Sequence, residues 1–216
     1  MSHKLIIVGD SAFAEVAYEY FTYDSDYDVV AFAVEREFLK RDTLFDIPIV
    51  ALEEVGALYA PAEHSFYAAT VYTQSNRLRS RLYYAMKEKG FAPASYISPR
   101  AALWRNAGIG EHCFIFEQNV VQPFTKIGDN VVLWSGNHIG HHSRIGSHSF
   151  ISSHVVISGF VSVGEYCFMG VNAAVANNVV IGDNCTIGAG ALVLADVPNS
   201  RVIVGVWKKT SGQGTR

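Results

Sequence analysis

Charged residues are scarce in this chain of 216 residues. Only 17% of the residues are Asp, Glu, Lys or Arg, against roughly 25% in typical soluble domains. The 17 Lys and Arg residues nearly balance the 20 Asp and Glu residues, which leaves a net charge of −3. Such a balance gives no general attraction to nucleic acid or to an anionic membrane surface. We therefore expect neither as a partner.

The sequence also has no long hydrophobic run and only three cysteines. No apolar run reaches the roughly 18 residues that a membrane span needs, and the short run after Lys4 does not resemble a signal peptide. These features predict a cytoplasmic protein. In that compartment, an odd number of cysteines indicates packing rather than disulfides or thiol catalysis. The three are Cys113, Cys167 and Cys185.

The shortage of charge is confined to the second half of the chain. Residues 97–198 hold ten charged residues and the rest of the chain holds 27, whereas twelve of the 18 glycines lie within 97–198. The composition changes close to residue 96. We therefore predict a first domain over residues 1–95, a second domain over 96–200 and a C-terminal tail over 201–216.

A strict six-residue repeat runs through the second domain. Every sixth residue from Ile97 to Val193 is aliphatic or Met, in seventeen of seventeen cases, and eight of the residues that directly follow are Gly. Apolar residues recur every 3.6 positions in a helix and every two in a strand, so neither fits. The repeat predicts a parallel β-helix, in which three hexads complete a coil and residue i+18 stacks on residue i. We expect the glycines to serve a tight turn in each hexad.

The first domain alternates between strand-like and helix-like segments. Apolar runs at 4–8, 28–34, 48–50 and 65–71 predict strands, and helical spacing appears over 13–21 and 78–86. This alternation predicts a small Rossmann-like α/β domain, whose ligands bind at the carboxyl ends of the strands. Gly9, Asp10 and Ser11 stand at such an end, before a helix N-terminus that can hold phosphate. Because only one of the usual glycines is present, a nucleotide site and a purely structural domain both remain open.

Histidine is concentrated in one part of the repeat. Five of the eight histidines fall within seventeen positions, and histidine is the usual general base near neutral pH. A cluster of imidazoles in a domain poor in charge therefore predicts a reaction centre. The five are His138, His141, His142, His148 and His154.

Three segments carry a resemblance to a known family. These are IVGDS at 7–11, IGHHSRIG at 139–146 and CFMGVN at 167–172. They resemble the bacterial sugar acetyltransferases of the left-handed, hexapeptide-repeat β-helix class, and in particular the family of sialic acid O-acetyltransferases and nucleotide-amino-sugar N-acetyltransferases. The resemblance implies a homotrimer that uses acetyl-CoA, bound in a groove between neighbouring β-helices.

The same resemblance implies roles for individual residues. His141 matches the general base that deprotonates the acceptor amine or hydroxyl, and Gly159 matches a glycine whose N–H binds the thioester carbonyl. His142 stands where family members often carry an acid that orients the base. We expect contacts to the sugar substrate from Gly9, Asp10, Ser11, Glu35, Asn76, Arg77, His138 and His142. We expect contacts to the coenzyme from Gly159, Gly170, Asn177 and Lys208, and no bound metal.

Two other functions remain open. One is a trimeric β-helix metalloenzyme of the carbonic anhydrase type, with zinc held by histidines. His142, His148 and His154 are six residues apart, so they point along different faces of one prism, and such a site would have to be shared between chains. The other is a non-catalytic trimer that binds nucleotide sugars. The sequence leaves open which sugar and nucleotide are bound and whether nitrogen or oxygen is acylated.

Overall fold

The chain divides into two compact units. The computed structural model describes residues 3–208, so positions 209–216 of the predicted tail lie outside the described residues. The first unit contains the residues up to Ser98 together with Glu111–Phe114, and the second contains Pro99–Gly110 and the residues from Ile115 onward. Within the described range, no helix combines the length and the apolar character that crossing a bilayer requires.

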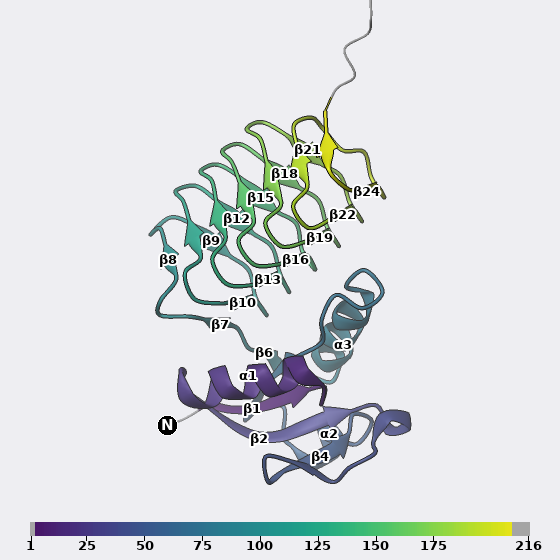
Figure 1. Cartoon of the computed structure of the whole chain (residues 1–216). Coiled ribbons are helices and arrows are strands. Elements are labelled where there is room, and N and C mark those ends of the chain that lie inside the picture. Colours follow the sequence, from purple (N-terminus) through teal and green to yellow (C-terminus); the bar gives the residue numbers. More distant parts are fainter. Residues whose placement is uncertain (1–2, 209–216) are drawn as a thin grey trace, which may run out of the picture. The chain divides into compact units, whose positions relative to one another are not determined.

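The first unit is a six-stranded sheet with helices between its strands (Figure 1). The strand order is β3-β4-β2-β1-β5-β6, in which β3 pairs with β4 antiparallel and the other pairs are parallel. The parallel strands thus follow the order 3-2-1-4-5, which is that of a doubly wound sheet. The predicted Rossmann-like domain is confirmed. Its elements are β1 (His3–Val8), α1 (Ala12–Tyr23), β2 (Tyr27–Val34), η1 (Arg36–Phe38), β3 (Thr43–Leu44), β4 (Ile47–Ala51), α2 (Val55–Leu58), β5 (His64–Ala68), α3 (Arg77–Glu88), β6 (Ala92–Pro93) and β7 (Tyr96–Ile97).

Strand β1 lies at the centre of this sheet, between β2 and β5. Its last four residues, LIIV, are all buried, because the central strand of a parallel sheet is covered on both faces. Helix α1 packs on β1 and β2 and buries Phe13, Ala17 and Phe21, which recur at helical spacing. The order in which successive strands are added to the sheet reverses between β1 and β5, and ligands bind beside such a switch point in folds of this type.

The second unit is a parallel β-helix of short strands. Each hexad supplies a two-residue strand that pairs with strands three hexads away, so that Ile139 lies between Val121 and Ile157. The strands stack into three parallel sheets, one of which Figure 1 shows as the row from β9 to β21. The first sheet contains β8 (Ala102–Leu103), β11 (Val120–Val121), β14 (His138–Ile139), β17 (Val156–Ile157), β20 (Ala174–Val175), β23 (Leu192–Val193) and β25 (Val206–Trp207). The second contains β9 (Gly108–Ile109), β12 (Lys126–Ile127), β15 (Arg144–Ile145), β18 (Ser162–Val163) and β21 (Val180–Ile181). The third contains β10 (Phe114–Ile115), β13 (Val132–Leu133), β16 (Phe150–Ile151), β19 (Phe168–Met169), β22 (Thr186–Ile187) and β24 (Val202–Ile203).

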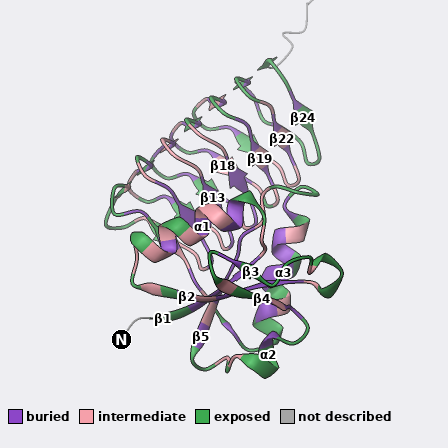
Figure 2. Ribbon diagram, turned by 60° about the horizontal axis from the view of Figure 1, so that its bottom comes forward, coloured by how far each residue is buried: buried purple, intermediate pink, exposed green. Residues whose placement is uncertain are grey.

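The repeating aliphatic residues form the interior of this β-helix (Figure 2). From Ile115 to Val193 all of them are buried, and each such side chain removed from water contributes about 1.5–3 kcal/mol to stability. Ile97 is 42% exposed, because the first coil has another coil on one side only. The three cysteines are buried thiols that form no disulfide in the described structure. Burial raises the pKa of the Cys167 thiol to about 12, so this thiol stays protonated.

The corners of the β-helix are made by residues in the left-handed backbone region. Every sixth residue from His112 to Gly190 has a positive φ, a conformation that Asn and His tolerate better than most side chains. The glycines that directly follow the aliphatic residues have no positive φ. A Cβ on Gly140 would lie 2.6 Å from the nitrogen of Gly159 in the next coil. The expectation that these glycines make the turns was wrong: they are required because adjacent backbones approach closely.

Candidate active site

His141 lies at the corner between β14 and β15, and its side chain is exposed. Its backbone N–H donates to Gln122 Oε1 (2.9 Å), and its carbonyl accepts the N–H of Phe160 (2.9 Å). The Phe160 ring meets the imidazole edge-on, with centroids 5.1 Å apart and planes at 89°. The backbone of His141 and one side of its ring are therefore fixed, as a reacting group requires.

The neighbouring residue holds the His141 ring from another side. The Nδ1 atoms of His141 and His142 lie 3.1 Å apart, which is hydrogen-bond distance. The His142 ring is stacked between two aromatic rings, with centroid distances of 4.6 Å to Phe124 and 4.8 Å to Phe160. The three rings belong to successive coils at the same corner, and all three residues have φ near 60°. The stack fixes the plane of the His142 imidazole.

Gly159 lies one coil from His141 and faces its ring. A Cβ at Gly159 would stand 2.8 Å from both Nε2 and Cε1 of His141, so only glycine leaves room for the imidazole at this place. The N–H of Gly159 donates to Asn177 Oδ1 (2.9 Å), in the coil after that. The sequence thus predicted correctly that residues 141 and 159 stack, but the contact between Gly159 and Asn177 has no signal in the sequence beyond their spacing of 18.

The other predicted residues of the β-helix lie farther along its faces. His138 is half-buried and stands on the outward side of β14, between Val120 and Val156 of the adjacent strands. Gly170 packs against the next coil, where a Cβ would stand 2.5 Å from the Ala189 nitrogen. Lys208 is exposed and directly follows β25. The structure therefore brings His141, His142, Gly159 and Asn177 together.

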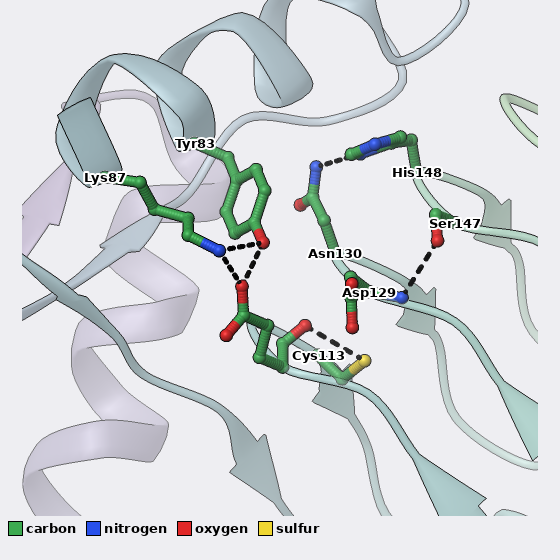
Figure 3. Close-up of polar contacts among 8 residues, drawn as sticks. Tyr83, Lys87, Cys113, Asp129, Asn130, Ser147 and His148 are labelled. Atoms are coloured by element: carbon green, nitrogen blue, oxygen red, sulfur yellow. Dashed lines mark hydrogen bonds and ion pairs between the residues drawn. The ribbon is translucent and has the colours of Figure 1, made fainter.

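The histidines spaced by six occupy three different corners. His148 is buried, with its Nδ1 at 2.9 Å from Asn130 Nδ2 (Figure 3), and its ring stacks on Tyr166. The His154 imidazole lies against Gly136, where a Cβ would be 2.5 Å from it. Over residues 3–208, no three His, Cys, Asp or Glu side chains are placed to hold one metal ion. Within a single chain, His148 and His154 therefore pack against the adjacent coils at their corners.

The first unit contains a cavity of about 430 Å³ at the carboxyl ends of β1 and β2. Four of the predicted substrate residues, Gly9, Asp10, Ser11 and Glu35, line it. The complete lining is Val8, Gly9, Asp10, Ser11, Ala33, Val34, Glu35, Glu37, Phe38, Thr70, Thr73, Gln74, Leu78, Arg81 and Leu82. A cavity at this end of a doubly wound sheet is where a nucleotide would be expected.

The turn after β1 gives the cavity its shape. Gly9 has a φ of 122°, a backbone conformation that residues with a side chain rarely adopt. A Cβ there would also lie only 3.0 Å from the Ala69 carbonyl oxygen, so both the backbone and the available space favour glycine. Ser11 is the N-cap of α1, and its carbonyl accepts the N–H groups of Ala14 and Glu15. The Asp10 carboxylate forms an ion pair with Arg41 at 3.3 Å. The positive end of α1 therefore faces the same cavity as these polar groups.

An ion pair between Glu35 and Arg81 closes one wall of the cavity. The Arg81 guanidinium donates to both carboxylate oxygens of Glu35, at 2.6 and 2.9 Å. This hydrogen bonding lowers the pKa of Glu35. Arg81 was missed in the sequence, although it lies three residues after Leu78 on the helix face that the apolar spacing marks.

Asn76 and Arg77 are placed outside the lining of this cavity. Asn76 is the N-cap of α3, is fully buried and has a left-handed backbone with φ 65°. Its Oδ1 accepts a hydrogen bond from the buried guanidinium of Arg79 (3.2 Å). Arg77 is exposed at the first position of the helix. Asn76 therefore shapes the loop whose residues Thr73 and Gln74 reach the cavity.

Comparison with known proteins agrees with the repeat. The bacterial transferase hexapeptide (six repeats) family matches residues 124–159 and 160–195. No curated protein sequence is significantly similar to the chain.

Several solved structures are similar over both units. A mutant of perosamine N-acetyltransferase from Caulobacter crescentus, in complex with CoA and GDP-perosamine, is 25% identical, with 94% of this chain and 93% of that chain covered and a TM-score of 0.83. The acetyltransferase domain of PglB from Neisseria gonorrhoeae is 21% identical, with 93% and 96% covered and a TM-score of 0.82. WeeI from Acinetobacter baumannii is 18% identical, with 93% and 96% covered and a TM-score of 0.68.

These likenesses extend over nearly the whole chain and confirm the predicted combination of a small α/β domain with a left-handed parallel β-helix. The repeat, the fold and the 25% identity agree with the resemblance read from the three sequence segments. The chain therefore carries the bacterial transferase hexapeptide repeat over residues 124–195 and shares its fold with these acetyltransferase structures.

Proposed function

We propose that this chain transfers the acetyl group of acetyl-CoA to a nucleotide-linked sugar, with His141 as the general base. The observation that carries the proposal is the exposed His141 imidazole directly beside the Gly159 backbone. It stands in a chain that is 25% identical to a perosamine N-acetyltransferase in complex with CoA and GDP-perosamine. Because that relative is named an N-acetyltransferase, an amine acceptor is favoured over a hydroxyl.

The proposed reaction is a direct acyl transfer. The lone pair of the acceptor amine attacks the thioester carbonyl carbon while Nε2 of His141 takes a proton from that nitrogen, because the nitrogen would otherwise become positively charged as the bond forms. The Gly159 N–H donates to the oxygen that becomes negatively charged in the tetrahedral intermediate. The C–S bond then breaks, and the leaving thiolate of CoA takes the proton that His141 received, which returns His141 to its free base form. The products are the acetamido sugar and free CoA.

The cavity of the first unit is proposed to hold the nucleotide part of the acceptor. Anionic phosphates are favoured at the N-terminus of α1, where Gly9 and Ser11 leave the backbone accessible. Arg81 offers a guanidinium in the same lining, held in place by Glu35. Contacts from Glu35 and Asp10 to the ribose or the base remain predictions.

A homotrimer is proposed from one face of the β-helix. The outward residues of the sheet from β8 to β25 form a column that is apolar except at His138, and Val156 in it is 45% exposed. A second copy packed on such a patch would remove it from water. That face ends at the corner that carries His141, so a neighbouring chain would form one wall of a coenzyme groove there. The column consists of Ala102, Val120, His138, Val156, Ala174, Leu192 and Val206.

Gly159, Gly170, Asn177 and Lys208 are proposed to line that groove, and the cytoplasm is proposed as the location of the enzyme. An exposed lysine such as Lys208 suits the phosphates of CoA by its charge. His138 and His142 are adjacent to the same corner, where the acetyl acceptor would enter.

Release of free CoA thiol from acetyl-CoA tests this function directly. We expect turnover with at least one member of a panel of nucleotide-linked amino sugars and sialic acids, and a product that carries one acetyl group at nitrogen. No thiol release with any member, together with specific binding of a nucleotide sugar, would instead identify a non-catalytic binding trimer. Stoichiometric zinc in the purified trimer would identify a metalloenzyme and overturn the proposal.

A further inference from the structure

We propose that His142 is the positioning residue of the candidate base: its Nδ1 accepts the Nδ1–H of His141 and thereby leaves the Nε2 lone pair of His141 free to take the acceptor's proton. The two Nδ1 atoms are 3.1 Å apart. This inference rests on the proposed function, and it names the group that holds the His141 imidazole in the tautomer that a general base needs. His142 itself exchanges no proton with the substrate.

The tautomer decides whether His141 acts as a base. Two neutral imidazoles joined through their Nδ1 atoms share one proton between those atoms. If His142 donated that proton, Nε2 of His141 would carry the other hydrogen and would have no lone pair to offer. With His142 as acceptor, the proton is on Nδ1 of His141 and Nε2 is the free base. Only the second arrangement supports general base catalysis.

The structure holds His142 firmly enough for this role. Its ring is stacked at 27° on Phe124 and at 16° on Phe160, and its backbone N–H donates to the Pro123 carbonyl (3.1 Å). A hydrogen-bond acceptor whose plane is fixed restricts the ring that donates to it. His141 is thus held by His142 at Nδ1 and by Phe160 at its face.

No carboxylate competes for this place in the described chain. The side chains in contact with the two imidazoles are those of Phe124 and Phe160, and Gln122 binds the backbone of His141. None of these groups titrates, and no ion pair within residues 3–208 involves His141 or His142. The group that orients His141 is therefore an imidazole and not a carboxylate.

The corner itself supplies conservative replacements for the test. Phe occupies the equivalent left-handed position at residues 124 and 160, and Asn occupies it at residue 178, with φ 62°. His142→Phe keeps an aromatic ring in the stack and removes the acceptor. His142→Asn removes the ring and restores a neutral acceptor oxygen. His154→Phe makes the same exchange at another left-handed corner (φ 57°) and is the matched control.

Steady-state kinetics of these variants test the inference. We expect His142→Phe to lower kcat by about 10- to 100-fold, the range for loss of a partner that orients a functional histidine. The KM for acetyl-CoA should change little, His142→Asn should recover most of the rate, and His154→Phe should leave it unchanged. An undiminished kcat in folded His142→Phe, or a folded His142→Asn as slow as His142→Phe, would overturn the inference in favour of a stacking role.

The pH profile supplies a second readout that does not depend on His142→Phe being stable. His142→Asp puts a negative charge beside His141, so the acid limb of kcat/KM should move to higher pH by about 1–3 units. His142→Asn should leave that limb near its wild-type position. Equal profiles for the Asp and Asn variants would contradict a contact through Nδ1. An active His141→Ala would refute the proposed base itself, whereas an inactive His141→Ala beside a fully active His142→Phe would refute only this inference.

Discussion

The backbone N–H of Gly159 donates a hydrogen bond to the side-chain oxygen of Asn177, 2.9 Å away. The proposed donor to the thioester carbonyl thus already has an acceptor within the chain. Both acceptors are neutral carbonyl oxygens, and one such hydrogen bond contributes only about 0.5–1.5 kcal/mol net. Replacing Asn177 Oδ1 by the thioester oxygen as the acceptor therefore costs little free energy. Until the substrate binds, the hydrogen bond to Asn177 keeps the Gly159 N–H in its orientation.

Asn177→Asp is expected to slow the reaction. The carboxylate would hold the Gly159 N–H about twice as strongly as the amide does, and its negative charge would oppose the oxyanion. We predict a fall in kcat/KM for acetyl-CoA of about 10²- to 10³-fold, the loss seen when an oxyanion donor is removed. Asn172→Asp adds the same charge at another corner of the β-helix (φ 58°) and should have little effect. Unchanged kinetics in Asn177→Asp would show that the Gly159 amide is not the donor.

Gly159→Ala is expected to displace the imidazole without unfolding the coil. The new methyl group would lie 2.8 Å from His141 Nε2, while the φ of Gly159 is one that alanine adopts freely. A misplacement of about 1 Å at a reacting group can cost about 10²-fold in rate, and we predict a fall in kcat of that order. Gly108→Ala is the control, because nothing lies within 4 Å of its added Cβ. A normal kcat with the melting temperature retained would mean that His141 has no fixed place in the reaction.

Glu35→Gln is expected to weaken the first unit in a pH-dependent way. The Arg81 hydrogen bonds lower the pKa of Glu35 in the folded protein. The ion pair therefore contributes its full stability above the unfolded carboxyl pKa of about 4.3, and this contribution is lost as the pH falls through the folded value. Because Arg81 is 55% exposed, we expect a loss of no more than about 1 kcal/mol in the free energy of unfolding at pH 7.

Urea unfolding at two pH values checks this expectation. The difference between wild type and Glu35→Gln should be measurable at pH 7 and should shrink as the pH falls below about 4.3, because protonation of Glu35 in the folded protein removes the ion pair. A difference that is constant with pH would mean that the substitution acts through packing and not through the charge of Glu35.

The sequence predicted the β-helix well because its signal is repeated in every coil. Ile139 is buried for the same reason as Ile157, and each further hexad strengthens the inference. The role of the glycines was misjudged, since a close approach such as that of Gly140 to Gly159 depends on the spacing of coils. The left-handed corner at His142 was equally invisible, because Phe and His give no turn signal of their own.

The part of the candidate site that the sequence predicted consists of residues whose relative positions follow from the repeat. His141 and Gly159 are related by a spacing of 18, which the repeat fixes. Arg81 was missed because its partner Glu35 lies 46 residues away, and no local pattern joins a strand end to a helix face. The stacking of His142 between Phe124 and Phe160 likewise needs the coils to be in place.

The activity of His141→Ala tests the central claim most directly. The measurement is kcat for thiol release from acetyl-CoA with the best nucleotide-linked amino sugar, compared with that of wild type, with oligomeric state and melting temperature recorded for both. The account predicts a trimer of normal stability whose transfer rate has fallen by at least about 10²-fold, the lower range for loss of a general base. A folded His141→Ala that transfers acetyl groups at the wild-type rate would contradict it.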